Sequence, residues 1–333
     1  MRFVCPACKG PLEESAESFS CPACRRQFPV ILGIPDFRVS PDPYIGIQED
    51  REKGVRLDAE AGRRGFEALV RHYYAITPDH PADLVPRRIR HALAEVDLSR
   101  FLLRDAHVLP QSPGAPRAVA LLDIGCSTGA LLIAASEAVD TLVGVDVAFR
   151  WLAIGRTRLR EAGVSATLVC ANAEALPFPD RAFHVVTASD LIEHVTDAAS
   201  TVREAHRVLT RGGTTVWTTN NRHAPVREPH VGLWGVGNLP RRWQRRYVAL
   251  RRPDLRPYHV SLRGAGELAR LFRSGGFDEA VVEAAALIAP DSSPSLSSLL
   301  GAYNRVRRLA GMRSVARLIG PRLLVRATKS SVA

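Results

Sequence analysis

The sequence is poor in lysine, in aromatic residues and in long apolar runs. Only Lys9, Lys53 and Lys329 are lysines among 45 basic residues, which leaves 42 arginines, and aromatic residues make up 6% of the 333 positions. No stretch reaches the roughly 18 consecutive apolar residues that a membrane-spanning helix needs, so we expect none. The first residues, Met1–Cys5, lack the apolar core of a secretion signal, so we expect a cytoplasmic protein.

The formal net charge of +11 at pH 7 permits a nucleic-acid partner. However, the near-exclusive use of arginine together with abundant alanine and glycine is also typical of a GC-rich genome. Arginine clusters at 241–256 and 305–326 are the places where an anionic partner would bind. The charge alone does not separate a generally basic surface from a functional patch.

Four of the six cysteines form two Cys-x-x-Cys pairs, Cys5/Cys8 and Cys21/Cys24, with twelve residues between the pairs. Each pair can form a tight turn that presents two thiolates, and two such turns complete a tetrahedral zinc site. Since so small a module cannot hold a core by itself, the metal would contribute the folding free energy. All four ligands come from protein, so we expect structural zinc rather than catalytic zinc, in a reducing compartment.

The run CPACKGPL…CPACRRQFPVILGIPDF resembles the Trm112-like zinc ribbon over residues 3–37. The resemblance implies a small β-rich module that supports a methyltransferase, either as its partner or fused to it. We therefore expect a ribbon domain at 1–37. Residues 38–60, rich in charge, proline and glycine, are expected to be a linker, and helical apolar spacing at 61–105 predicts at least two helices. Together, residues 38–117 form the expected linker and helical cap.

Residues 118–220 alternate strand-like apolar runs with helical stretches, as in a parallel α/β sheet. The first strand ends at Asp123 and runs into a glycine-containing turn, where the backbone can approach a ligand closely. The next strand ends at Asp146, a position suited to bind the hydroxyls of a ribose. A dinucleotide-binding fold has the same two features, a glycine-containing turn after the first strand and an acidic residue at the end of the second. It is disfavoured because Asp123 would face a pyrophosphate and because the GxGxxG spacing is absent.

The complete run, LLDIGCSTGALL…VGVDVA…CANAEALPFPDRAFHVVTASDLIEHV…REAHRVLTRGGTTVWTTNN, resembles class I S-adenosylmethionine-dependent methyltransferases of the UbiE/UbiG-like group, the methyltransferase domain 11 type. The resemblance implies an α/β fold over 118–333, with a Rossmann-like seven-stranded sheet whose last two strands lie at 281–289 and Arg322–Thr328. It also implies S-adenosylmethionine as the cofactor. Within this domain we expect a substrate and lid segment at 221–260 and a helical insertion at 291–320.

The resemblance also implies cofactor-binding residues. Those expected at the methionine moiety, the glycine turn, the ribose, the adenine and the sulfonium are Asp123, Gly125, Ser127, Gly129, Asp146, Val147, Asn172, Ala173 and Asp190. Ser127 stands where the family's motif has a glycine, and Asn172 stands where an aspartate is commoner. Neither change removes a group able to form hydrogen bonds.

Methyl transfer from a sulfonium is a direct displacement in which positioning supplies much of the rate. An oxygen or nitrogen acceptor also calls for a base, for which histidine is suited. The candidates are His194, His230 and His259, with His223 considered beside them. One alternative for His194 is a packing role. Another is metal binding, because Asp190-x-x-Glu193-His194 resembles a carboxylate pattern that binds Mg²⁺ in some relatives, where a further ligand is needed.

These observations predict methylation of a small molecule or of a glycan- or lipid-linked intermediate, on oxygen. The alternatives are an RNA methyltransferase, which salt-sensitive RNA retention would favour, and a non-catalytic scaffold that recruits a partner through the ribbon. The apolar spacing at 296–319, with interleaved arginines, predicts a lid or a homodimer contact in preference to a membrane contact.

Overall fold

A seven-stranded sheet forms the centre of the molecule. The computed structural model describes residues 1–77, 81–108, 118–255, 257–289 and 294–331. The sheet strands are β5 (Ala118–Ile124), β6 (Val139–Asp146), β7 (Thr167–Cys170), β8 (Phe183–Ser189), β9 (Leu209–Asn220), β10 (Ala280–Ala284) and β11 (Arg322–Thr328). Their order is β10-β11-β9-β8-β5-β6-β7. Strands β5 to β9 pair in parallel, and β11 lies antiparallel between β9 and β10. The α/β fold class expected from the sequence is confirmed.

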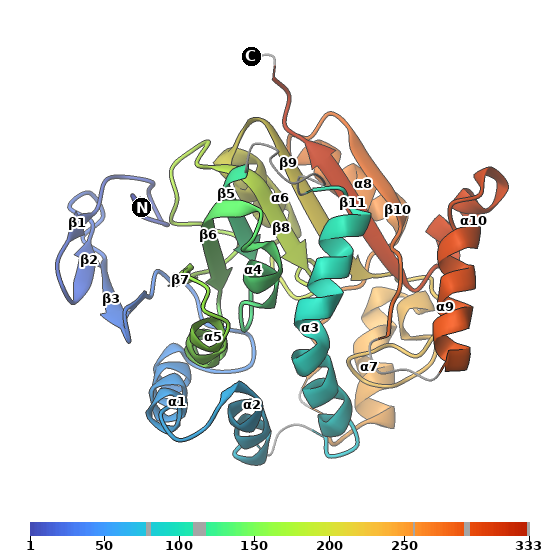
Figure 1. Ribbon diagram of the computed structural model, residues 1–333, viewed down its shortest axis with the longest axis horizontal. Helices are drawn as coiled ribbons and strands as arrows, with labels where there is room; N and C mark the ends of the chain where they lie inside the picture. The colour runs from blue at the N-terminus through green and yellow to red at the C-terminus, as the bar shows by residue number, and fades with distance from the viewer. Residues whose placement is uncertain (78–80, 109–117, 256, 290–293, 332–333) are drawn as a thin grey trace.

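Helices cover both faces of this sheet. Figure 1 shows α3 and α4 in front of the strands, with α6 and α8 behind them. The helices are α1 (Ile47–Glu60), α2 (Phe66–Ala75), α3 (Val85–Asp105), α4 (Ala130–Ala135), α5 (Phe149–Glu161), α6 (Ala198–Val208), the short 3-10 helix η1 (Val236–Asn238), α7 (Arg241–Arg251), α8 (Ala265–Ser274), α9 (Pro294–Val306) and α10 (Ala310–Ile319). Among the described residues, no helix combines the length and the apolar character needed to cross a bilayer.

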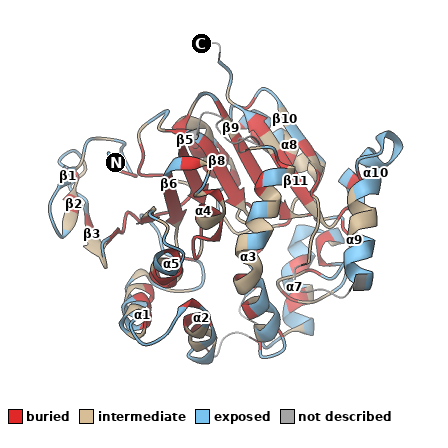
Figure 2. Ribbon diagram, in the orientation of Figure 1, coloured by how far each residue is buried: buried red, intermediate tan, exposed pale blue. Residues whose placement is uncertain are grey.

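The N-terminal module is a small antiparallel sheet packed against one edge of the large one. Its strands are β1 (Glu13–Glu14), β2 (Ser18–Ser20), β3 (Gln27–Ile31) and β4 (Ile34–Pro35). Directly after β4, Asp36 pairs with Cys170 at the end of β7, where the Phe37 amide donates to the Cys170 carbonyl at 2.7 Å. The rings of Phe3, Phe19 and Phe37 join the core beside Phe178. The ribbon is therefore joined to the sheet by backbone pairing and a shared core (Figure 2).

Residues 38–60 are not a linker throughout, because 47–60 form helix α1. Leu57 is buried against α5 and α2, in one cluster with Ile154. Gly54, one of the glycines that suggested a linker, instead allows close helix packing, since a Cβ there would lie 2.5 Å from the ring of Phe149. The linker prediction failed because this glycine serves a helix contact rather than a turn.

A buried ion network fixes the chain between the ribbon and α1. Arg38, fully buried, donates to Asp36 at 2.6 Å and to Asp50 of α1 at 2.7 Å. Arg150 at the start of α5 donates to Asp50 at 2.7 Å and to Asp42 at 2.9 Å. Hydrogen bonds of this kind offset the desolvation of buried charges. Segment 36–50 is thereby held over the carboxyl ends of β6 and β7.

One strand is shorter than expected. The sequence predicts strand six at 281–289, whereas β10 ends at Ala284. Beyond it the side-chain amide of Asn304 replaces a strand partner, since its Oδ1 accepts from the Leu287 amide at 2.9 Å and its Nδ2 donates to the Leu287 carbonyl at 2.8 Å. Residues 285–288 are thus free to line a cavity. The helical insertion expected at 291–320 contains α9 and α10, and its residues 291–293 lie outside the described residues.

Candidate active site

A cavity of about 980 Å³ opens at the carboxyl ends of the parallel strands. It lies where the strand order reverses, with β5 flanked by β6 on one side and β8 on the other. Such a switch point is where open α/β sheets bind ligands. Most of the residues expected at the cofactor line it: Asp123, Gly125, Ser127, Asp146, Val147, Asn172, Ala173 and Asp190.

Asp146, the last residue of β6, is held by two backbone amides. Its Oδ2 accepts from Ser127 and its Oδ1 from Ala148, each at 2.8 Å. Burial raises its pKa to about 6, and these two amides oppose the rise. The carboxylate keeps further lone pairs for a ligand's hydroxyls. Ser127 has φ +48°, a left-handed conformation that favours glycine, which accounts for the glycine usual at this place.

Asp123 is the penultimate residue of β5, which extends one residue further than expected, to Ile124, and it is buried below the glycine turn. Its Oδ1 accepts from the Thr187 hydroxyl of β8 at 2.8 Å. Burial raises its pKa to about 7, and the nearby charge of Asp146 adds to the rise. A ligand carrying positive charge would reverse this effect, because an opposite charge favours the ionised form. The site is therefore suited to a cation at Asp123.

The glycines of the turn have different surroundings. Gly125 has φ +76°, and a Cβ there would lie 3.0 Å from Leu191. Gly129 has φ +77° at the start of α4, with Leu159 behind it, and it is not among the residues that line the cavity. Its conformation opens the helix, and its contact with a ligand stays a prediction.

Part of the cavity wall comes from the chain that follows the ribbon, which the sequence did not indicate. Asn172 Oδ1 accepts from the Val39 amide at 2.8 Å and from the Ser40 amide at 3.2 Å, and its Nδ2 donates to Ser40 Oγ at 2.9 Å. Residues 39–44 line the cavity. Asn172 therefore fixes the segment that covers the cavity, and it also lines the cavity itself. The sequence held one hint of this cover, because the side-chain amide of Asn172 can both donate and accept hydrogen bonds.

Asp190, after β8, is paired with Arg322 at the start of β11. The Arg322 Nη2 atom lies 2.8 and 2.9 Å from the two carboxylate oxygens and 3.0 Å from Thr218 Oγ1. Both residues line the cavity. Sequence reasoning missed Arg322, because it is 132 positions away from Asp190.

A second cavity, of about 1250 Å³, adjoins the first. Asp190, His194 and Arg322 line both cavities, so they lie at the junction. Its walls combine aromatic rings and basic side chains, among them Tyr44, Tyr73, Tyr74, Trp151, Tyr258, Arg56, Arg87, Arg88 and Arg227. This composition suits a molecule with an apolar part and an anionic group.

Three side chains at the junction form a continuous chain of hydrogen bonds. His194 Nε2 and His230 Nε2 are 3.1 Å apart, and His230 Nδ1 bonds to the Glu228 carboxylate. Glu228 also accepts from the amides of His230 and Val231, both at 2.9 Å. Burial opposes charge on His230, but the bond to Glu228 and the charges of Glu228 and Glu193 outweigh it and raise the pKa of His230. Burial, with His230 nearby, lowers the pKa of His194 to about 3.

The other histidines are not part of this chain. His259 lines the second cavity and is exposed, with its ring 5.7 Å from that of Tyr44. His223 packs beside Gly264, where a Cβ would lie 2.7 Å from its ring, and it lines neither cavity. Of the three histidines expected to act in catalysis, the structure joins His194 to His230.

Ligand atoms of Glu193, His194 and His230 lie within 4.8 Å of one another. The expected Mg²⁺ pattern needed Asp190, whose carboxylate instead bonds to Arg322. Glu193 is fully buried and accepts from Thr219 Oγ1 at 2.9 Å. Two imidazoles and one carboxylate suit zinc or iron better than magnesium, which prefers oxygen ligands.

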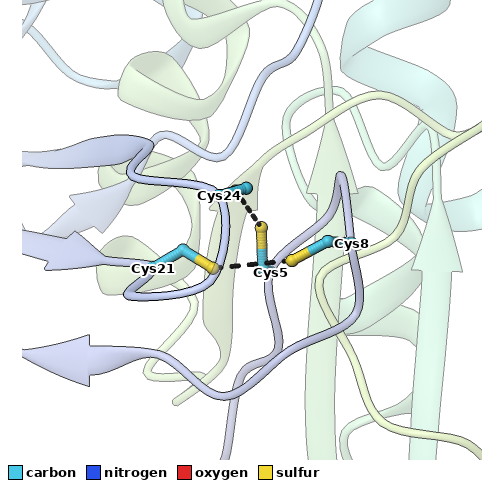
Figure 3. Close-up of side chains that lie close together, drawn as sticks. All are labelled: Cys5, Cys8, Cys21 and Cys24. Atoms are coloured by element: carbon cyan, nitrogen blue, oxygen red, sulfur yellow. Dashed lines mark hydrogen bonds between the residues drawn. The ribbon is translucent and has the colours of Figure 1, made fainter.

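The four ribbon cysteines converge (Figure 3). Their sulfur atoms all lie within 4.8 Å of one another, with 3.5 Å between Cys5 and Cys24 and between Cys8 and Cys21. Sulfurs bound to one tetrahedral zinc would be about 3.8 Å apart. The two turns are equivalent, because the Cys5 amide donates to the Gly10 carbonyl and the Cys21 amide to the Arg26 carbonyl, each at 2.9 Å. These thiols fit a structural zinc ion.

Comparisons with known families agree with this division of the chain. Residues 122–217 match the family described as a methyltransferase domain, and residues 3–33 match the Trm112p-like protein family. The chain thus contains a methyltransferase domain that follows a Trm112p-like module. Both resemblances expected from the sequence are confirmed.

Curated relatives match the central part of the chain. It is similar to the ubiquinone/menaquinone biosynthesis C-methyltransferase UbiE of Shewanella sp. (strain W3-18-1), with 34% identity over 155 residues, 42% of this chain and 61% of the relative. UbiE of Shewanella baltica (strain OS155) is 38% identical over 152 residues, with the same coverage. The chain spans less than two thirds of the length of these relatives.

Solved structures give weaker similarities. The YcgJ protein of Bacillus subtilis aligns with 72% of this chain and 99% of its own, at 21% identity and a TM-score of 0.46. A complex of the Haloferax volcanii Trm112 methyltransferase activator with a methyltransferase also matches, covering 72% of this chain and 94% of that chain, at 14% identity and a TM-score of 0.46.

Proposed function

We propose that the protein transfers a methyl group from S-adenosylmethionine to oxygen on a small molecule or a glycan- or lipid-linked intermediate. The observation that carries this proposal is the pair of adjoining cavities with His194 between them. The first has acidic residues at the strand ends for the donor, and the second has aromatic and basic walls for an acceptor. S-adenosylmethionine supplies a methyl group on a sulfonium, and the chain's own residues position the acceptor and remove its proton.

The hydrogen-bond chain gives a route for that proton. Because a carboxylate only accepts, His230 carries hydrogen on Nδ1 and presents a lone pair on Nε2. His194 then donates from Nε2 to His230, which leaves His194 Nδ1 as the base. When the acceptor hydroxyl gives its proton to Nδ1, the Nε2 proton passes to His230. The raised pKa of His230 and the lowered pKa of His194 favour this direction.

The second cavity supports the acceptor class. Rings such as Tyr73 and Trp151, whose centroids are 4.3 Å apart, offer an apolar surface, and arginines around them offer anion contacts. A small or lipid-linked acceptor that bears an acidic group could use both the apolar surface and the anion contacts. An RNA strand would need a continuous basic groove rather than a cavity lined by aromatic rings.

Donor binding is the first test. Titration calorimetry with S-adenosylmethionine and S-adenosylhomocysteine should show binding that Asp146→Ala weakens about tenfold or more, because two hydrogen bonds to a carboxylate are lost. Asp97→Ala, an exposed carboxylate of α3 whose side chain is 65% accessible, is the control and should bind normally. Absence of binding by folded, zinc-loaded protein would favour the scaffold function instead.

The acceptor chemistry is tested with a methyl-labelled donor. Nuclear magnetic resonance of the labelled product separates an oxygen-bound from a carbon-bound methyl group, and a carbon-bound one would contradict the proposed O-methylation. A chelator that abolishes turnover without releasing the ribbon zinc would show that Glu193, His194 and His230 hold a metal instead of relaying a proton. Salt-sensitive retention of RNA with labelled RNA product would support the nucleic-acid alternative.

A further inference from the structure

Helices α9 and α10 follow one another at the edge of the molecule, where α10 contacts β10, at the opposite end from the zinc ribbon (Figure 1). We call residues 294–319 the edge hairpin. Residues 285–288 before it and Pro321 and Arg322 after it line the two cavities. The hairpin is therefore attached next to the candidate active site.

The hairpin carries much of the exposed apolar surface. Of the 18 large hydrophobic side chains exposed in the described residues, eight belong to it: Leu296, Leu299, Val306, Leu309, Met312, Val315, Leu318 and Ile319. Leu299, Leu309 and Leu318 are 65%, 58% and 61% accessible. Figure 2 shows the exposed colour over most of α10. Concentration of apolar groups in one surface element marks an interaction site.

Polar contacts, not apolar packing, attach α9 to the body. The Tyr303 hydroxyl donates to the Ala285 carbonyl at 3.2 Å, and Asn304 holds both backbone groups of Leu287. Arg307 is buried and reaches the Ala284 carbonyl at 2.9 Å and Asp105 of α3 at 2.6 Å. In α10 the buried side chain is Ala316. The large apolar residues are thus the ones left on the outside.

The charged side chains of the edge hairpin itself all have one sign. No aspartate or glutamate occurs between residues 292 and 333. Arg305, Arg308, Arg313 and Arg317 of the hairpin are exposed. A helix that combines an exposed apolar face with arginines binds in the interface of an anionic bilayer. A second copy would bring equal positive charges together, and RNA would gain nothing from the leucines.

We propose that the edge hairpin docks on a membrane surface that contains anionic lipid, with its apolar side chains in the headgroup region and its arginines at lipid phosphates. This binding goes beyond the methyl transfer proposed above and does not depend on it. Docking would hold the cavities next to the bilayer, because the chain on both sides of the hairpin lines them.

Vesicle binding of the full-length, zinc-loaded protein tests the proposal. In co-sedimentation we expect retention on vesicles of phosphatidylcholine mixed with phosphatidylglycerol, but not on phosphatidylcholine alone, and weaker retention at high salt. No retention on the mixed vesicles would overturn the proposal. Retention that is equal on both vesicles would overturn its electrostatic part.

Matched variants locate the binding surface. The triple variant Arg305→Gln, Arg313→Gln, Arg317→Gln should weaken binding about tenfold or more. Its control, Arg2→Gln, Arg26→Gln, Arg211→Gln, removes equal charge from exposed sites elsewhere and should change binding little. Equal weakening by both triples would show general attraction to a basic protein and would overturn the assignment to the hairpin.

Replacing exposed apolar side chains with glutamine distinguishes binding to a lipid surface from binding to another partner. Leu309→Gln with Leu318→Gln should also weaken vesicle binding about tenfold or more, whereas Leu250→Gln with Val281→Gln, which are 80% and 54% exposed elsewhere, should not. Thermal melting should stay unchanged for both pairs, since all four side chains are exposed. If light scattering shows a dimer that only the first pair dissociates, a second copy covers the hairpin and the proposal is wrong.

Discussion

Donor binding should release a proton from Asp123. Burial, with Asp146 nearby, raises the pKa of Asp123 to about 7, and burial raises that of Asp146 to about 6. A donor that places positive charge at Asp123 and hydroxyls at Asp146 binds the ionised forms. Affinity should therefore fall as the pH falls through these two values.

The size of the effect follows from the two pKa values. Between about pH 8 and about pH 5.5, Asp123 alone should weaken donor binding about 30-fold, and Asp146 should add about fourfold. At about pH 6.5 the two groups together should release about one proton per donor bound, most of it from Asp123. The donor-free fold shows the opposite trend. Since its Asp123 pKa lies above that of an unfolded chain, this group stabilises the fold below about pH 4, and that contribution is lost as the pH rises through about 7.

Calorimetry in two buffers of different ionisation enthalpy measures the protons released. The wild type should release about one proton at about pH 6.5, and Asp123→Asn only about 0.2. Asp97→Ala is the control and should match the wild type. Donor affinity that is flat across this pH range, with no proton released, would refute the reasoning.

Four further predictions follow from single contacts. Glu228→Gln should lower kcat about a hundredfold and shift the acidic limb of the pH–rate profile to lower pH, with donor affinity unchanged, because the pKa of His230 falls when the carboxylate is lost. Asn172→Ala should cost about 1 kcal/mol in urea unfolding, because the Val39 and Ser40 amides lose their acceptor at a partly buried site. Arg38→Met should cost about 3–5 kcal/mol, because it removes the buried positive charge that Asp36 and Asp50 share. Cys21→Ser should remove zinc by elemental analysis and lower Tm, as a chelator should.

Two of these variants have a matched control variant. Ser40→Ala should cost less than Asn172→Ala, since it removes a single hydrogen bond, the one that the Asn172 side-chain amide donates to Ser40 Oγ. Arg51→Met should cost less than Arg38→Met, because within the described part of the chain the Arg51 side chain bonds to Asp36 alone, and it is 24% exposed. Recovery of Tm when zinc is added back after chelation would assign the loss to the metal. An unchanged pH profile in Glu228→Gln would contradict the proton route.

The sequence predicted what depends on neighbouring residues. Asp146 ends its strand as expected, Asp123 lies one residue before the end of its strand, and the Cys-x-x-Cys spacing formed two equivalent turns. The last strand, Arg322–Thr328, has the predicted bounds. The linker predicted at 38–60 was wrong for residues 47–60, because proline and glycine content does not reveal whether a glycine lies in a turn or at a helix contact.

The sequence by itself determined the class of fold, the zinc ligands and the acidic strand ends, since turn geometry and strand periodicity are set within a few residues of each motif. Only the tertiary structure joined His194 to His230, 36 positions away, and Asp190 to Arg322. It also decided that residues 39–44 cover the cavity, through Asn172. These contacts depend on how separate elements pack around the end of the sheet, and no local pattern encodes that packing.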